Sequence, residues 1–264
     1  MKRRAAIYPS SVWRVARITS ADLFSRKIVL AAVLIYVIGL VVAFGLLHFQ
    51  PSLGGRFAAH VMIFLAFILY ASIVWIGGTE TVQDEYDRGT LEWLLGKGVS
   101  YAELVFGKYL GIVGTALGWS VFLGSMGLLL HWSWAGTWPL ALAFQLLSLA
   151  LRAMLWGAFV VSLSFGLGRF PAFVLGLAVY GMASGLGLWE EVVRHGAHPT
   201  LIWITKIAYG VLPRFDLIEI SNVLSATGSD RWVQGGLLSV YFLTYLAGIL
   251  CVAVFLAAQR KRSR

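Results

Sequence analysis

Long apolar runs separated by short polar segments make up most of the chain. Six runs approach the ~20 residues that an α-helix needs to cross the hydrocarbon core of a bilayer. They cover residues 28–47, 57–78, 108–130, 140–166, 170–189 and 235–258. Each run is continuous and does not alternate between apolar and polar positions, which favours helices over the strands of a membrane barrel. The pattern therefore predicts an all-α, polytopic membrane protein with six transmembrane helices in a single domain over residues 1–264.

Residues 8–26 precede the first run and have the pattern of an amphipathic helix. Pro9 and Ser10 favour a helix start. A helix from there gathers one largely apolar side from Val12, Val15, Ala16, Thr19 and Leu23. Arginines on another side suit a helix that lies in the inner headgroup layer, near anionic lipid. We therefore predict an N-terminal interfacial helix, with an ordinary basic flank as the alternative.

The polar segment over residues 190–234 is the longest outside the six runs. Its apolar stretch over 199–212 is shorter than a membrane span and ends at Pro213, which predicts short outer amphipathic helices. Glu191 and His195 have the i,i+4 spacing that can place two metal ligands on one helix face. A third fixed ligand is not evident in the sequence, so we predict no metal site.

Composition and charge agree with a membrane location. The chain is 59% hydrophobic and 12% charged, with a mean hydropathy of +0.81, whereas soluble domains are roughly 45–50% apolar. Fifteen of the 21 Lys and Arg residues lie in the N-terminal segment, the C-terminal tail and the loops after the second and fourth runs. By the positive-inside rule, both termini are cytoplasmic. The net charge of +9 then reflects topology, and nucleic acid is not an expected partner.

Arg152 is the one basic residue deep inside an apolar run. An arginine at this depth is costly unless it faces a polar partner, the bundle interior or a water-filled cavity. Two interpretations stay open. Arg152 pairs with another polar group inside the bundle, or it takes part in translocation.

Glycines recur around the start of the third run, at Gly107, Gly111, Gly114 and Gly118. Small residues at this spacing let helix backbones approach closely. The glycine stripe therefore predicts tight helix packing and does not by itself indicate a function.

The segment over residues 84–106 joins the second and third runs and carries many charges. Asp84 and Arg88 are four residues apart and predict an ion pair on a helix. Gly89 and Thr90 then predict a break and a new helix cap. The segment therefore reads as two short helices joined by a turn at the membrane surface.

The second of these short helices has an apolar face made by Leu91, Leu94 and Leu95. Ser100 and Glu103 have capping-box spacing and predict the start of the next helix. The leucine face is predicted to be available to a groove in a partner protein. The alternative is that it packs on the inner surface of the protein's own bundle.

Motifs in this segment resemble those of a known family. The chain has EYDRGTLEWLL over residues 85–95, Val-Ser at 99–100 and Gly-Lys at 107–108. This is similar to the signature of ABC-2-type transporter permeases, closest to the small six-span permeases of nitrous-oxide-reductase maturation and of bacterial multidrug or sodium export. Gly98 stands where the family usually has proline. The motifs cover some thirty residues, and the six-span layout extends a weaker resemblance over the whole chain.

The resemblance implies a permease subunit of an ATP-binding cassette transporter, an exporter in the bacterial cytoplasmic (inner) membrane. It implies a coupling helix that docks on a separate cytoplasmic ABC ATPase and is formed by Glu85, Arg88, Gly89, Thr90, Leu91, Leu94 and Leu95. The ATPase would bind ATP and Mg, drive alternating access, and work with two permease copies or with this chain and a sister permease.

The chain itself is expected to bind no cofactor and to have no catalytic residues. A phosphate-binding loop needs G-x-x-x-x-G-K followed by Ser or Thr, and neither Gly96-Lys97-Gly98 nor Gly107-Lys108-Tyr109 fits it. The chain is therefore not predicted to be an enzyme on its own. The alternatives are an ion-coupled secondary transporter, which would need acids near the midplane, an intramembrane hydrolase, or a membrane anchor without transport.

Overall fold

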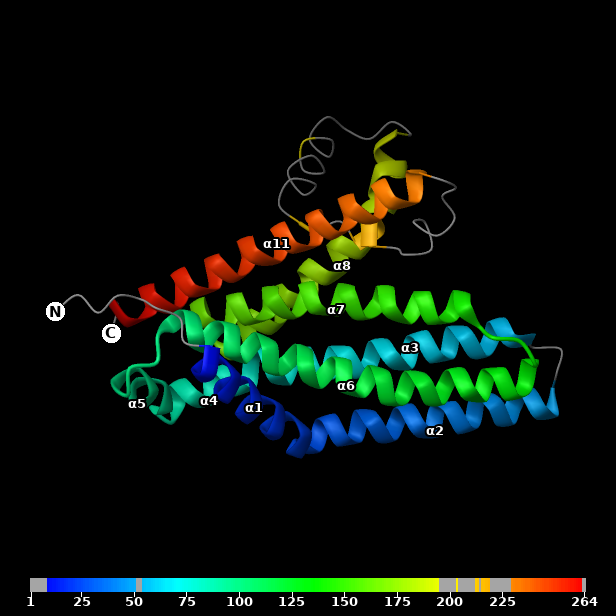
Figure 1. The fold of residues 1–264 in the computed structure, drawn as a ribbon, viewed down its shortest axis with the longest axis horizontal. Coiled ribbons are helices and arrows are strands. Elements are labelled where there is room, and N and C mark those ends of the chain that lie inside the picture. The colour runs from blue at the N-terminus through cyan, green and yellow to red at the C-terminus, as the bar shows by residue number, and fades with distance from the viewer. Residues whose placement is uncertain are drawn as a thin grey trace.

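The computed structural model (Figure 1) describes the backbone of residues 9–50, 54–194, 203, 212–213, 215–218 and 229–262. Side chains are described for 11–50, 54–185, 203, 212–213, 215, 218 and 235–259. Within these residues every regular element is a helix and there is no β-strand. The all-α prediction is confirmed.

Five helices in the described part are long and apolar enough to cross a membrane. They are α2 (Lys27–Phe49), the helix that begins as α3 (Gly54–Trp75) and runs on to Asp87, α6 (Tyr101–Ala135), α7 (Leu140–Gly166) and α11 (Ser229–Arg262). The run predicted over 170–189 corresponds to α8 (Arg169–Arg194), whose last side chains are among those not described. α8 is not one of the five helices that are long and apolar enough to cross a membrane. The other five are those expected of a membrane protein.

The long helices lie roughly side by side (Figure 1). α6 crosses in front of α3 in this view, and α3 packs against α2, α6 and α7. α7 packs in turn against α8 and α11. The start of α1 and the end of α11 lie at the same end of the molecule as the short helices α4 and α5. This end is called the α4–α5 end below.

The N-terminal helix α1 (Pro9–Ser25) packs along the first half of α6. Val15, Ala16, Thr19 and Leu23 are buried there, while the arginines of α1 are exposed. The side that the sequence marks as apolar is thus covered by α6. This contact leaves the opposite, arginine-bearing side of α1 exposed.

The glycine stripe of α6 makes the α1 contact possible. A Cβ atom at Gly107 would lie 2.6 Å from Val15, and one at Gly111 would lie 2.7 Å from Thr19. Real Cβ atoms do not come this close to their neighbours. The stripe therefore packs helices, as the sequence predicts.

The predicted outer helices over 190–234 fall mostly outside the described residues, and so do His195 and the side chain of Glu191. The described part includes the short 3₁₀ turn η3 (Phe215–Ile218), which packs on α7 and α8. Phe215 and Ile218 are fully buried in that contact. A piece of the long polar segment therefore reaches into the helix bundle.

Candidate partner-docking site at the α4–α5 end

The helix that begins as α3 changes its winding before it reaches this end. Ile76–Glu80 forms a π-helical turn, η2, and α4 (Thr81–Asp87) continues from it. A Cβ at Gly77 would lie 2.7 Å from Ile112, and one at Gly78 would lie 2.6 Å from Val160. The two glycines therefore let the π turn press against α6 and α7. Such turns are frequent at functional sites.

A tight turn separates α4 from the next short helix, α5 (Thr90–Gly96). Gly89 has φ +67°, and Gly98 beyond the helix has φ +91°, conformations that favour glycine. The Thr90 hydroxyl donates a hydrogen bond to the Glu85 carbonyl at 3.2 Å. The break lies where the sequence predicts it, and glycine geometry bounds α5 on both sides.

The leucine face of α5 points into the protein, against our expectation that it is available to a partner. Leu91 is 5% exposed, and Leu94 and Leu95 are half-buried against the main core. The alternative interpretation, packing on the bundle's own surface, is the one observed. The reason is that a seven-residue helix has few other apolar groups with which to attach itself to the bundle.

The exposed surface of α5 and its turns is polar and aromatic. Its exposed residues are Arg88, Gly89, Thr90, Glu92, Trp93, Gly96, Lys97 and Gly98. Trp93 is 59% exposed, and the Lys97 ammonium lies 3.6 Å above its ring. A large exposed aromatic beside a cation is typical of a residue that anchors a protein contact. We call this set the α5 outer face.

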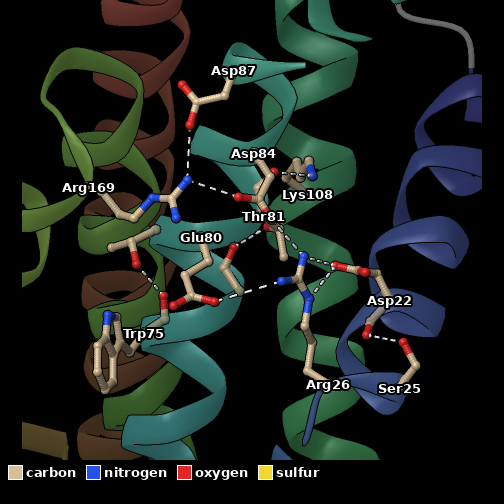
Figure 2. Close-up of polar contacts among 12 residues, drawn as sticks. Asp22, Ser25, Arg26, Trp75, Glu80, Thr81, Asp84, Asp87, Lys108 and Arg169 are labelled. Carbon is tan, nitrogen blue, oxygen red and sulfur yellow. Dashed lines mark hydrogen bonds and ion pairs between the residues drawn. The ribbon is translucent and has the colours of Figure 1, made fainter. Parts of the chain in front are cut away.

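Asp84 joins α4 to two distant parts of the chain (Figure 2). Its Oδ2 lies 2.9 Å from Arg26, between α1 and α2, and its Oδ1 lies 2.9 Å from Arg169, the first residue of α8. Arg26 also pairs with Asp22 at 3.0 Å, and Arg169 with Asp87 at 3.0 Å. These pairs take the place of the predicted Asp84–Arg88 pair, because both carboxylate oxygens are already used.

Arg26 keeps its charge at this junction. Burial lowers the pKa of its guanidinium group, but hydrogen bonds and charges from Asp22 and Asp84 outweigh that effect and leave the pKa above its usual value. Its other amino group lies 3.8 Å from Glu80 at the end of the π turn (Figure 2). Arg26 therefore ties the α1–α2 junction to both η2 and α4.

A second set of contacts fastens α4 to α6 and α7. The Lys108 ammonium, in α6, lies 2.6 Å from Glu85 Oε1 and donates to the Thr81 carbonyl at 3.2 Å. The Lys108 side chain is only 4% exposed. Gln83 donates to the Leu167 carbonyl, just past the end of α7, at 2.8 Å. Side chains of α4 thus reach the α1–α2 junction, α6, the end of α7 and the start of α8.

A cavity of about 310 Å³ opens between α1, α4, α5 and α6. It is lined by both kinds of charge and by Trp93 from the α5 outer face. Its lining residues include Asp22, Arg26, Asp84, Glu85, Arg88 and Lys108. The fixed charges of α4 therefore lie directly beside the exposed surface of α5.

The capping box at the start of α6 is present as predicted. Ser100 Oγ accepts from the Glu103 amide at 3.2 Å, and Glu103 accepts from the Ser100 amide at 2.7 Å. The Ser11 hydroxyl of α1 also donates to Glu103, at 2.7 Å. One carboxylate thus caps α6 and holds α1.

Replacing Glu103 by alanine is expected to destabilise the protein more than replacing Ser100. Ser100→Ala removes one cap bond, which costs about 1 kcal/mol, whereas Glu103→Ala removes the acceptor of two part-buried donors, the Ser100 amide and the Ser11 hydroxyl. Thermal unfolding of both purified variants in detergent measures the difference. Equal melting temperatures would show that the Ser11 contact contributes nothing.

Arg152, the other residue singled out from the sequence, is distant in sequence from the residues of α4 and α5. It is half-buried in α7, and its Nε is buried without a hydrogen-bond partner. The structure therefore does not bring Arg152 together with Glu85, Arg88 and the other predicted coupling residues.

Sequence reasoning missed the residues that hold α4. Arg26 and Arg169 were counted only as cytoplasmic charges, and Lys108 was noted otherwise only as part of the Gly-Lys motif. The signal that could have found them is the excess of acids over residues 80–87, four carboxylates with no basic residue among them. Such a group requires cations from elsewhere in the chain.

Comparison with known proteins adds no further constraint. No protein-family model matches the chain, and no curated protein matches its sequence significantly.

Proposed function

We propose that the chain is the membrane-spanning permease subunit of an ABC transporter, an exporter in a bacterial cytoplasmic membrane. The observation that supports this proposal is the α5 outer face, a small exposed surface suited to docking. The helix that leads into it, α4, is held by ion pairs and hydrogen bonds to several other helices. In this proposal α8 is the sixth span and both termini are cytoplasmic. The separate ATPase supplies ATP and Mg binding.

The contacts of α4 suggest how the docking surface would act on the bundle. A pull on α5 acts on α4, because only the Arg88–Gly89 turn separates them. Ion pairs then carry the displacement to the α1–α2 junction and to the start of α8. The π turn η2 offers a place where the long helix can change its winding. Two permeases moved in this way by two ATPases would alternate between inward and outward access.

The docking proposal predicts loss of ATPase binding when the α5 outer face is altered. An ABC ATPase from the same genome is co-expressed with the chain, and co-elution in detergent and ATP turnover are measured. Trp93→Ala and Arg88→Ala are expected to weaken co-elution at least tenfold, as expected for anchor residues. Leu94 is unsuitable for this test because its side chain packs inward.

Trp138→Ala is the matched control, since Trp138 is also exposed but lies at the other end of α6 and α7. It should co-elute like the wild type. Co-elution unchanged in both Trp93→Ala and Arg88→Ala would contradict docking at this face. Co-elution without any change in ATP turnover would instead favour a membrane anchor.

A further inference from the structure

The 310 Å³ cavity between α1, α4, α5 and α6, called the junction cavity below, has charged groups that the ion pairs described above do not use up. Asp22 lines it and gives only Oδ2 to Arg26, while its side chain stays 41% exposed. Arg88 lines it as well, is exposed, and has no ion-pair partner among the described residues. One carboxylate oxygen and one guanidinium group are therefore available to a ligand.

The charges that line the junction cavity are balanced. Three carboxylates and three cations line it, which are Asp22, Asp84, Glu85, Arg26, Arg88 and Lys108. A ligand with a single charge meets repulsion as well as attraction there, whereas a zwitterion can pair with both signs at once. The volume lies at the lower end of the about 300–1,000 Å³ of small-molecule sites. The lining therefore suits a small zwitterionic group.

The junction cavity lies at the level where the apolar runs of the sequence end. Arg26 comes just before the run over 28–47, and Lys108 is the first residue of the run over 108–130. Thr81, also in the lining, follows the run over 57–78. Because such runs have the length suited to the hydrocarbon core, the cavity falls at the level of the lipid headgroups.

The exposed side of α1 next to the cavity also suits lipid. It carries the large apolar residues Trp13, Ile18 and Phe24 together with Arg14 and Arg17. Exposed apolar side chains mixed with arginines are typical of a helix that lies in the membrane interface. Ile18 is itself part of the cavity lining. A ligand bound there has an apolar contact at the rim, which favours a lipid over a soluble zwitterion.

The lining favours a primary ammonium over a quaternary one. Quaternary ammonium groups are bound by cages of aromatic rings, and Trp93 is the single aromatic among the described lining residues. The Lys97 ammonium already lies 3.6 Å above that ring. Carboxylate oxygens, such as those of Asp22, need a nitrogen that carries N–H donors. Ethanolamine has such a nitrogen and choline does not.

We infer that the junction cavity binds the headgroup of phosphatidylethanolamine. The ammonium donates to the Asp22 carboxylate, the phosphate accepts from the Arg88 guanidinium, and Ile18 contacts the glycerol end of the lipid. The bound lipid joins α1 to α4, beside the ion pair that Arg26 makes with Asp84. This inference goes beyond the proposed transport function and does not depend on an ATPase.

The first test compares headgroups on the wild-type chain alone, purified in dodecyl maltoside. Dioctanoyl phosphatidylethanolamine, phosphatidylcholine and phosphatidylglycerol are titrated separately, and native mass spectrometry counts the bound lipids. Phosphatidylethanolamine should bind about tenfold more tightly than either of the others, as for one charge-assisted hydrogen bond gained. Equal affinity for the three lipids overturns the inference, and this comparison does not depend on the folding of any variant.

Two variants locate the site within the chain. Asp22→Asn should lower phosphatidylethanolamine affinity about tenfold and leave phosphatidylcholine affinity unchanged, because it weakens only the ammonium contact. Arg88→Gln should lower the affinity for both lipids, because both carry the phosphate. Arg17→Gln is the matched control, since it removes an exposed charge of α1 that does not line the cavity, and it should bind like the wild type. Wild-type affinities in both Asp22→Asn and Arg88→Gln overturn the assignment.

Soluble O-phosphoethanolamine distinguishes a lipid site from a metabolite site. It has the same charged groups without the glycerol and acyl chains, so it should displace the bound lipid only at concentrations at least tenfold higher. Displacement at equal concentration would show that the apolar rim contributes nothing and would overturn the lipid assignment. Since no ATPase is present in these measurements, loss of ATPase docking in Arg88→Ala and loss of lipid binding are separate results.

Discussion

Gly111→Ala is expected to loosen α1 from α6 and to lower the melting temperature of the purified protein. The added Cβ would lie 2.7 Å from Thr19 and 2.8 Å from the Ala16 carbonyl oxygen. The carbonyl belongs to the backbone, so α1 as a whole must move. Overpacking of this kind typically costs about 1–3 kcal/mol, which exceeds the roughly 1 kcal/mol that alanine gains over glycine inside a helix. Gly111→Leu should be worse.

Gly114→Ala is the matched control for this prediction. Its Cβ would meet only Ser20 Oγ at 3.8 Å, an ordinary contact. This variant should be as stable as the wild type or slightly more so, because alanine favours the helix. Thermal unfolding in detergent measures all three variants, and protease cleavage within α1 reports its release. If Gly111→Ala melts like Gly114→Ala, the close packing of α1 on α6 is wrong.

Lys108→Met is expected to be the most damaging single change at the α4–α5 end. It leaves the Glu85 carboxylate without its cation in a site where one of its oxygens, Oε2, is already buried without a hydrogen-bond partner. Breaking a buried ion pair by removing one partner costs about 3–5 kcal/mol. We expect a large drop in melting temperature or loss of folded protein.

Replacing both partners should be milder than replacing Lys108 alone. The pair Lys108→Met with Glu85→Gln removes both charges and should recover part of the stability, a coupling that a double-mutant cycle measures. Lys97→Met is the control, since Lys97 is exposed and its loss should change the melting temperature little. A Lys108→Met protein as stable as Lys97→Met would show that the pair does not hold α4.

The apolar runs in the sequence predicted the positions of most long helices, but they did not predict where several of those helices begin and end. The run over 140–166 coincides with α7, while the run over 57–78 continues as helix to Asp87. The third run begins at 108, yet α6 begins at Tyr101. Hydropathy marks the length of chain suited to lipid. Caps such as Ser100 and ion pairs such as Lys108–Glu85 allow a helix to continue into polar sequence.

Periodicity showed which leucines of α5 share a face, but it could not show the direction of that face. The same three leucines can bind a partner or attach the helix to its own bundle, because both surfaces are apolar. The sequence pattern did not single out Trp93, because one aromatic residue among leucines forms no repeat that would indicate its exposure. Its exposure follows from the inward packing of Leu91, which only the tertiary structure reveals.

The two ion pairs of Asp84 also bear on how the protein is made. Its cations lie 58 residues before it and 85 residues after it in the chain. During synthesis from the N-terminus, Arg26 is present when α4 emerges, but Arg169 arrives only after α6 and α7 have been inserted. The ion pair to α8 therefore closes last in biogenesis, and a chain that ends before α8 holds α4 through Arg26 and Lys108 alone. A partner that requires a rigid α4–α5 end would in this way bind finished subunits in preference to incomplete ones.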